Sequence, residues 1–298
     1  WAISLRGGEA VPFFDDSDVE DDDDKAPTSG SFTKDFSQIA YTEESERVDH
    51  EEWEARKKEK DDAYYAEEKL TWRQIWVYGA ESGEKTRITE GEFDHQGPQW
   101  SPDGQWIVFG VGNYFLARNR PAQVMMVRPD GSEERILTTG VGNAGFPSFS
   151  PNGTDVVYRF WGETAGGLRV LTLATGMIRT LTTGYDNFPH WSPRGDRIVF
   201  SRLANGDFDI FSIRPDGSEL KQLTTSLGND SHPAWSPDGG HILFSSSRFG
   251  FKDEAPLADI PQPYGELFIM RADGSEQRAL TDNRWEEGTP AWQPRSEQ

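Results

Sequence analysis

Short apolar runs alternate with polar turns along most of the chain, and the alternation follows a fixed order. An apolar run, Pro233-Ala-Trp235, is followed by the turn Ser236-Pro-Asp-Gly239 and then by the alternating run His241-Ile-Leu-Phe-Ser245. Two further apolar runs come after it, separated by Asp273-Gly274. Alternation of this kind predicts β-strands, and Pro and Gly at these places predict tight hairpin turns. One unit therefore predicts a four-stranded antiparallel sheet.

The unit recurs through the sequence. Near copies of Trp-Ser-Pro-Asp-Gly occupy residues 100–104, 149–153, 191–195 and 235–239. Phe32-Thr-Lys-Asp-Phe36 aligns with them without a gap, and Trp292-Gln-Pro opens one more unit. Periods of about 40–50 residues with several short strands each are typical of propeller blades.

The two ends of the chain resemble parts of one further blade. Residues 1–14 match a third and fourth strand, and residues 283–298 match an inner strand. Joining them would close a ring and remove exposed sheet edges, so we predict an all-β, six-bladed propeller with five full blades and one composite blade. We expect a single domain in which the full blades are residues 32–91, 92–140, 141–184, 185–225 and 226–282. An acidic linker, 15–31, precedes them, and the first contains a charged helical insertion, 43–71.

Charge restricts the partners that we expect. The chain has 298 residues and a net charge of −21, which argues against nucleic acid and anionic membranes. No apolar stretch is long enough to cross a membrane as a helix, so we expect no membrane insertion. We expect a monomer. The location is left open, although two Asn-x-Ser/Thr sequons slightly favour an extracytoplasmic or secreted protein.

Antiparallel strands bring two kinds of connection to the same face of the disc, which we call the loop face. These connections join a fourth strand to the next first strand, and a second strand to a third. The long insertions fall in this class: 43–71, 110–121, 160–166, 202–207 and 246–265. The opposite, or turn, face carries the tight turns. Because function usually lies on variable loops held by a rigid scaffold, we place the ligand on the loop face, around the central channel.

Polar residues just before each inner strand are expected to surround the channel mouth. They are Asp94, His95, Asn143, Asp186, Asn187, Asp230, His232, Glu286 and Glu287. No cofactor is firmly implied, but His95, His232, Asp94 and Asp230 could hold a divalent metal, or the group could supply a general base. Alternatively, such residues satisfy backbone groups of the adjoining turns.

Aromatic residues divide into two classes by their spacing. Trp100, Trp191, Trp235 and Trp292 follow the period of the repeat and are therefore expected in the core. Aromatic residues in the insertions do not follow the period, which makes them candidates for ligand contacts: Tyr114, Phe115, Trp161, Phe249, Phe251 and Tyr264. Three arginines in the same loops, Arg118, Arg120 and Arg248, could bind a carboxylate.

The motif set resembles the TolB-type propeller repeat, which also occurs in the propellers of prolyl-oligopeptidase-type serine peptidases. Trp-Ser-Pro-Asp-Gly, a downstream Asp-Gly-Ser and Leu-Thr-Thr carry this resemblance, which covers almost the whole chain. The insertion 51–68 followed by Trp72-Arg-Gln-Ile-Trp-Val77 looks most like the propeller of acylaminoacyl-peptidase-like enzymes. The ending, from Pro261-Gln-Pro-Tyr-Gly-Glu266 onward, looks more like free-standing TolB-like proteins.

The resemblance implies a fold and leaves three functions open. The first is a non-catalytic propeller that binds a protein, peptide or glycan. The second is the substrate-gating propeller of a serine peptidase whose catalytic domain is absent, because the sequence has no Gly-x-Ser-x-Gly elbow. The third is a metal-dependent lyase or hydrolase acting at the channel mouth. Oligogalacturonate-lyase propellers use a His-rich metal centre there, and only His95 and His232 could match it.

Overall fold

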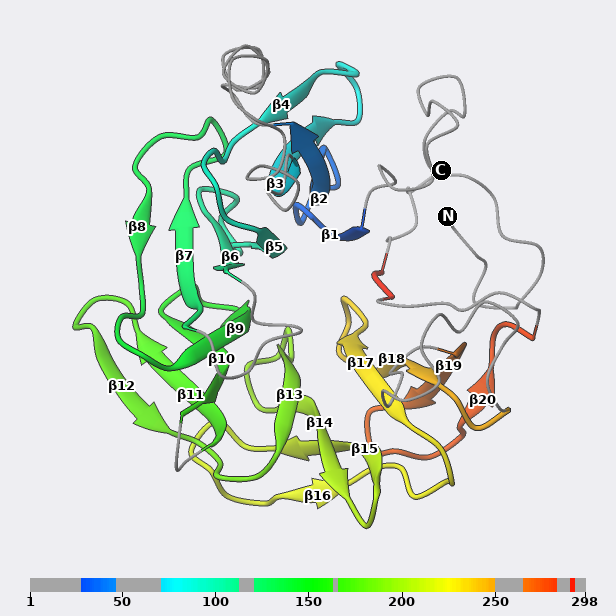
Figure 1. Ribbon diagram of the computed structural model, residues 1–298. Coiled ribbons are helices and arrows are strands. Elements are labelled where there is room, and N and C mark those ends of the chain that lie inside the picture. The colour runs from blue at the N-terminus through cyan, green and yellow to red at the C-terminus, as the bar shows by residue number, and fades with distance from the viewer. Residues whose placement is uncertain are drawn as a thin grey trace, which may run out of the picture.

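Five four-stranded antiparallel sheets make up the fold. The computed structural model describes residues 28–46, 71–112, 121–162, 166–249, 265–282 and 290–292. The sheets stand around a common axis with their first strands innermost (Figure 1). Each strand pairs with the next one in sequence. The described residues are thus all-β and contain no helix, as expected for a propeller.

The strands follow the repeat unit by unit. The first blade holds β1 (Thr28–Phe32), β2 (Gln38–Glu46), β3 (Thr71–Gly79) and β4 (Lys85–Arg87). The second holds β5 (His95–Trp100), β6 (Ile107–Val111), β7 (Gln123–Val127) and β8 (Arg135–Ile136). The third holds β9 (Asn143–Phe149), β10 (Asp155–Trp161), β11 (Gly166–Thr172) and β12 (Met177–Thr180). The fourth holds β13 (Asp186–Trp191), β14 (Ile198–Ala204), β15 (Asp207–Ile213) and β16 (Lys221–Gln222). The fifth holds β17 (Asp230–Trp235), β18 (His241–Ser246), β19 (Glu266–Arg271) and β20 (Arg278–Ala279).

Three predictions about the ends and the insertion need correction. The described residues form five blades and not six, and residues 290–292, assigned to the composite blade, contain no strand. The helical insertion is wrong at its edges, because residues 43–46 belong to β2 and residue 71 to β3. β1 begins at Thr28, inside the expected linker, because the inner strand pairs back along β2 beyond the motif itself. Residues 1–27 and 47–70 lie outside the described residues.

The aromatic-Ser-Pro turn is closed by the same backbone hydrogen bond in four blades, from the glycine N–H to the serine carbonyl oxygen. In the second blade the Gly104 N–H donates to the Ser101 carbonyl oxygen at 2.9 Å, and the Trp106 N–H donates to the Ser101 hydroxyl at 2.9 Å. Gly104 has a φ of 67°, a left-handed conformation that glycine adopts without steric cost. Phe36 takes the equivalent place in the first blade with a φ of 61°, and its N–H donates to the Thr33 carbonyl oxygen. The degenerate first copy of the motif therefore folds like the others.

The Leu-Thr pair of each repeat ties the fourth strand to the third. In all five blades the threonine hydroxyl accepts a hydrogen bond from a backbone N–H of the third strand at 2.9 Å. The threonines are Thr89, Thr138, Thr182, Thr224 and Thr281. A hydroxyl can accept this bond and still donate one, so the other partner is free to differ between blades.

Each hydrophobic core lies between neighbouring blades. Trp100, Ile107 and Phe109 of the second blade pack against Ile75 and Ala40 of the first, and the other interfaces repeat this arrangement. The motif aromatic residue of each blade thus fills the space beside the sheet before it. The Nε1 atom of Trp100 also donates to the carbonyl oxygen of Ser31 in the first blade at 3.0 Å. Trp100, Trp191 and Trp235 are therefore core residues, as predicted, and Trp292 is partly buried against the fifth blade.

Candidate ligand-binding face

A left-handed residue followed by proline interrupts the inner strand of four blades. Gly97, Phe146, Phe188 and His232 have φ angles of 65°, 53°, 50° and 49°. Beside each of them the pairing with the second strand shifts register. A left-handed conformation costs a residue with a side chain about 1–2 kcal/mol, so the surrounding structure must hold these residues in place.

The bulges bring three rings into contact along the inner strands. The ring centroids of Phe146 and Phe188 are 4.4 Å apart, and those of Phe188 and His232 are 3.8 Å apart. We call these three side chains the aromatic row. Its members come from β9, β13 and β17, which are among the strands nearest the central axis in Figure 1, and the second blade has Gly97 at the equivalent place. A row of rings at an inner wall can pack against apolar or aromatic groups of a ligand.

Carboxylates at the start of the inner strands are engaged by the protein itself. Asp186 is fully buried and accepts two hydrogen bonds from the Arg202 guanidinium, at 2.6 and 2.9 Å. Asp230 is also fully buried, and its Oδ2 atom accepts one from Arg248 at 2.7 Å. Asp94 accepts from the backbone N–H of Arg73 at 2.9 Å. Asp94 thus bonds to a backbone group, as the alternative predicts, whereas Asp186 and Asp230 are bound by arginine side chains.

Arg159 holds a further polar cluster between the third and fourth blades. Its guanidinium donates to the side-chain oxygens of Asn143 and Asn187, at the starts of β9 and β13. It also lies 3.9 Å from the ring of Trp161 and 5.0 Å from the ring of Phe146. Only 1% of Arg159 is exposed, so this cation does not face solvent. It packs against the ring of Phe146, a member of the aromatic row.

Burial shifts the titration of several groups on this side of the molecule. Burial raises the pKa of Asp209 to about 6, and the nearby charge of Asp230 adds to the effect, while the Thr224 hydroxyl opposes it. Burial also raises the pKa of Asp230, against the lowering effect of Arg248. The pKa of His95 is lowered, again by burial. A carboxyl that titrates near pH 6 is a candidate for proton transfer, although buried networks produce the same shift.

The predicted site residues fall into three groups. His95, Asp186, Asp230 and His232 lie at the inner strands as expected, and all four are buried. Trp161, predicted as a ligand contact, is buried beneath Tyr185 and Arg159, whereas Phe249 is 53% exposed. Arg248 is directed to Asp230 and Gln277. The others lie outside the described residues: Tyr114, Phe115, Arg118, Arg120, Phe251, Tyr264, Glu286 and Glu287.

The described residues contain no group of side chains that supports the metal prediction. Within the described ranges no three His, Asp or Glu side chains lie close enough to hold a metal ion. Asp230, one of the four candidate ligands, is held by Arg248. The assignment of His95, His232, Asp94 and Asp230 to a metal therefore stays a prediction.

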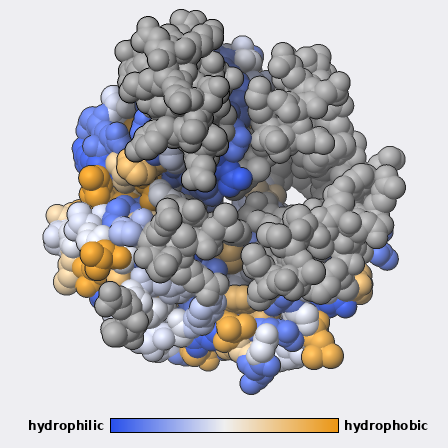
Figure 2. Space-filling view, in the orientation of Figure 1, coloured by the Kyte–Doolittle hydropathy of each residue, from blue (hydrophilic) through white to orange (hydrophobic). Residues whose placement is uncertain are grey.

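Of the exposed apolar side chains on the loop face, only Phe249 was anticipated from the sequence. Five residues in the connections and strand ends of this face expose between 40% and 87% of their surface: Phe93, Val141, Leu203, Leu227 and Phe249. They come from four blades and occur close to the starts of inner strands or the ends of second strands. In the view of Figure 2, hydrophobic residues occur at several separate places around the ring. The sequence contains a signal for two of these exposed residues, because Val141 and Leu227 are apolar residues in loops and come directly before glycine.

Comparison with known proteins agrees with this architecture. Residues 111–253 match the model of the TolB beta propeller domain. A TolB homolog from Chlorobium luteolum is 37% identical over 198 residues, which are 64% of this chain and 42% of the relative. An uncharacterised protein from Agrobacterium fabrum is 31% identical over 141 residues, or 43% of this chain and 46% of that protein. The chain thus spans less than half the length of the curated relatives that it matches.

Similarity to solved structures extends over most of the described blades. A structure described as putative TolB from Agrobacterium tumefaciens has a TM-score of 0.67 and 18% identity, with 89% of this chain and 83% of that chain covered. An oligogalacturonate lyase with manganese has a TM-score of 0.52 at 19% identity, covering 85% and 64%. A puromycin-hydrolyzing peptidase from Mycobacterium tuberculosis reaches 0.59 at 12%, covering 86% and 38%. Identities this low show the fold alone. The resemblance drawn from the repeat is confirmed: the chain is a β-propeller that is similar to the TolB beta propeller domain.

Proposed function

We propose that this propeller is a binding module that recognises a protein or peptide on its loop face, around the central channel. The observation that carries the proposal is the set of exposed apolar side chains in the loops and strand ends of that face: Phe93, Val141, Leu203, Leu227 and Phe249. Exposed apolar groups rimmed by polar residues are characteristic of protein interaction surfaces.

The aromatic row supports the same proposal. Phe146 and Phe188 are only partly buried, and they are held in a left-handed conformation that disfavours any residue except glycine. Strain of this kind is retained where the exact position of a side chain matters. An inserted peptide side chain would meet these rings at the inner wall, while the surrounding loops contact its flanks.

Charge favours a peptide that is neutral or basic. The net charge of −21 attracts cationic partners and repels acidic ones, and its effect on the association rate weakens as salt is added. We therefore expect association to slow at higher ionic strength, with a smaller change in dissociation.

The two enzymatic alternatives have less support. No contact among the described residues points to a peptidase gate, and a lyase needs a metal centre that the described residues do not form. A glycan ligand remains compatible with exposed aromatic side chains such as Phe249. However, most of the exposed apolar residues are aliphatic, which favours a peptide over a sugar.

A peptide-display selection tests the proposal. Random peptides selected on the wild-type chain are measured against a variant carrying Phe93→Ser, Val141→Ser, Leu227→Ser and Phe249→Ser. We expect this variant to lose at least tenfold in affinity, because the apolar anchors are removed. The matched control replaces exposed apolar residues away from the loop face, Ile136→Ser, Met177→Ser and Leu220→Ser, and should bind normally. Equal affinity for the loop-face variant and the wild type would refute the proposal.

A further inference from the structure

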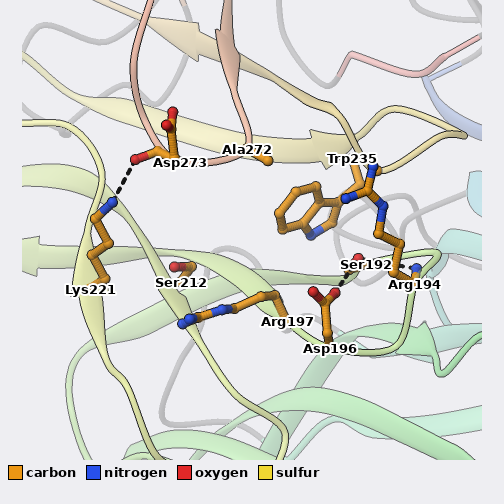
Figure 3. A pocket seen from close by; sticks show the side chains of 10 residues that line it. Ser192, Arg194, Asp196, Arg197, Ser212, Lys221, Trp235, Ala272 and Asp273 are labelled. Carbon is orange, nitrogen blue, oxygen red and sulfur yellow. Dashed lines mark hydrogen bonds between the residues drawn. The ribbon is translucent and has the colours of Figure 1, made fainter.

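A pocket on the turn face, opposite the proposed binding surface, departs from the repeat in three ways. It lies between the fourth and fifth blades and has a volume of about 230 Å³ (Figure 3). Side chains from the turn β13–β14, from β15 and β16, and from the turn β19–β20 line it. This volume equals the space of roughly eight water molecules, so an occupant must be smaller than a drug-sized ligand.

The first departure creates the space. Ser212 is paired with Val199 at a position where the other four blades have Val77, Met126, Val170 and Ile269. A serine there removes most of the side-chain volume that fills this layer elsewhere. Ser212 is buried and lines the pocket, so the hole left by the missing side chain opens directly into it.

The second departure concerns the Trp235 indole. Trp235 is 5% exposed and lines the pocket, and its Nε1 atom has no hydrogen-bond partner among the described residues. The equivalent indoles of Trp100 and Trp292 donate at 3.0 Å to the carbonyl oxygens of Ser31 and Ala234 in the preceding blade. A buried N–H left without an acceptor costs about 1–3 kcal/mol. An acceptor atom of a ligand in the pocket would satisfy it.

The third departure places a second cation at the rim, in addition to Lys221, whose position carries Arg135, Arg179 and Arg278 in three other blades. Arg194 stands where the other turns have Asp35, Asp103, Asn152 and Asp238. It extends across Gly239 and donates to the Asp238 carbonyl oxygen at 3.0 Å. Lys221 donates to the carbonyl oxygen of Asp273 at 2.7 Å, on the other side of the pocket (Figure 3). Within the described part of the chain neither cation forms an ion pair, in a protein with a net charge of −21.

The other lining groups define the rest of the ligand. Arg197 is already paired with Glu219 and is therefore less available to an anion. Asp196 accepts from the Ser192 hydroxyl at 3.0 Å and keeps its second oxygen at the pocket. The Asp196 carboxylate beside the cations would repel a bare, compact anion, but it can accept hydrogen bonds from hydroxyl groups of a ligand.

From this arrangement we infer that the turn face holds a second binding site, for a small polyhydroxylated carboxylate. Arg194 and Lys221 attract the carboxylate of the ligand from the two sides of the pocket (Figure 3), and an oxygen of the ligand accepts the Trp235 N–H. The hydroxyl groups of the ligand donate to Asp196 and fill the space beside Ser212. This site is separate from the loop face, so its occupancy does not depend on the proposed peptide binding.

The test uses gluconate with two matched compounds on the full chain. Sorbitol has the same carbon chain and hydroxyls without the carboxylate, and hexanoate has the carboxylate without the hydroxyls. The readout is the indole N–H signal of Trp235 in a ¹H–¹⁵N spectrum, assigned by its loss in Trp235→Phe. We expect gluconate to shift this signal saturably, and both other compounds to bind at least tenfold more weakly.

Variants separate the site from unspecific binding. Ser212→Val restores the residue type of the other blades, so the protein should fold normally while gluconate binding is lost. Lys221→Gln should weaken binding at least tenfold, and Arg135→Gln, the equivalent change on β8, should leave it unchanged. The inference is overturned if gluconate does not shift the Trp235 signal, if Ser212→Val still binds it, or if sorbitol or hexanoate binds as well as gluconate.

Discussion

The two faces of the disc are built from the same strands but differ in how closely they follow the repeat. On the turn face, Ser-Pro turns and Asp-Gly-Ser turns repeat nearly the same hydrogen bonds from blade to blade, including the Ser132 and Ser218 hydroxyls bonded to the preceding Asp at 2.6 Å. On the loop face, the threonine bond to the third strand recurs in all five blades, whereas the charged side chains near it differ. These side chains have different partners: Arg202 donates to Asp186, Arg248 to Asp230, and Arg159 to Asn143. Shared bonds identify the scaffold, and departures from them identify the places where the chain has been adapted.

The largest effect is expected from breaking a buried ion pair of the loop face. Asp186→Asn leaves the Arg202 guanidinium without its carboxylate in a largely buried position, 18% of that side chain being exposed. Removing one partner of such a pair costs about 3 kcal/mol or more of unfolding free energy, which urea denaturation measures.

The matched change on the turn face is Glu133→Gln. Glu133 pairs with Arg128 and Arg135, but half of its side chain is exposed, so solvent and salt already screen the interaction. We expect a much smaller loss of stability than in Asp186→Asn. Equal losses in the two variants would mean that burial does not distinguish the faces.

An intermediate effect is expected from His190, which joins two blades. Its Nδ1 atom accepts the backbone N–H of Trp235 at 3.1 Å, and burial lowers its pKa to about 4. An unfolded histidine titrates near 6.5, so the unfolded state binds the extra proton first as the pH falls. The free energy of unfolding should therefore decrease between about pH 6.5 and pH 4, by about 2–3 kcal/mol from this residue alone.

His190→Ser isolates that contribution. In the preceding interface the Ser148 hydroxyl accepts the Trp191 N–H at 3.1 Å, so serine supplies the same bond without titrating. We expect the variant to lose less stability than the wild type on going from pH 7 to pH 4.5. Parallel pH profiles for both proteins would contradict the assignment. Asp209 has the opposite sign, because its raised pKa, about 6, makes its contribution largest at low pH and reduces it as the pH rises through 6.

The smallest effect is expected at Phe36 on the turn face. Phe36→Gly relieves a left-handed conformation but removes the ring contact with Phe32, whose centroid is 5.5 Å away. Each contribution is on the order of 1 kcal/mol, so the melting temperature should change by only a few degrees. A large loss would show that the Phe36 ring does more than occupy the glycine position of the turn.

The sequence alone could predict the strands, the turns and the core tryptophans, because each depends on residues near in sequence and is repeated. It could not predict the pairing of Asp186 with Arg202 or of Asp230 with Arg248, since the two arginines occupy different positions in their repeats. Trp161 was misassigned for a physical reason: it is off the period, yet the packing of Arg159 and Tyr185 buries it. The described residues form five blades; the sixth was predicted from residues 1–14 and 283–298, of which the structure describes only 290–292. Ser212, by contrast, is visible on aligning the repeats as a polar residue in an apolar column.

Each motif aromatic residue packs against the sheet that precedes it in the chain, so the blades of the propeller are covered one after another in sequence order. The apolar side of a blade is covered only after the motif aromatic residue of the next unit has been synthesised, about 45 residues later along the chain. At ribosomal speeds of roughly 5–20 residues per second, each new sheet keeps one apolar side uncovered for roughly 2–9 seconds during synthesis. Trp292 covers this side of the fifth blade. Its Nε1 atom donates to the Ala234 carbonyl oxygen, and its ring packs beside Leu243, Ile269 and Leu280. The interfaces between neighbouring blades therefore close in the order in which the chain is synthesised.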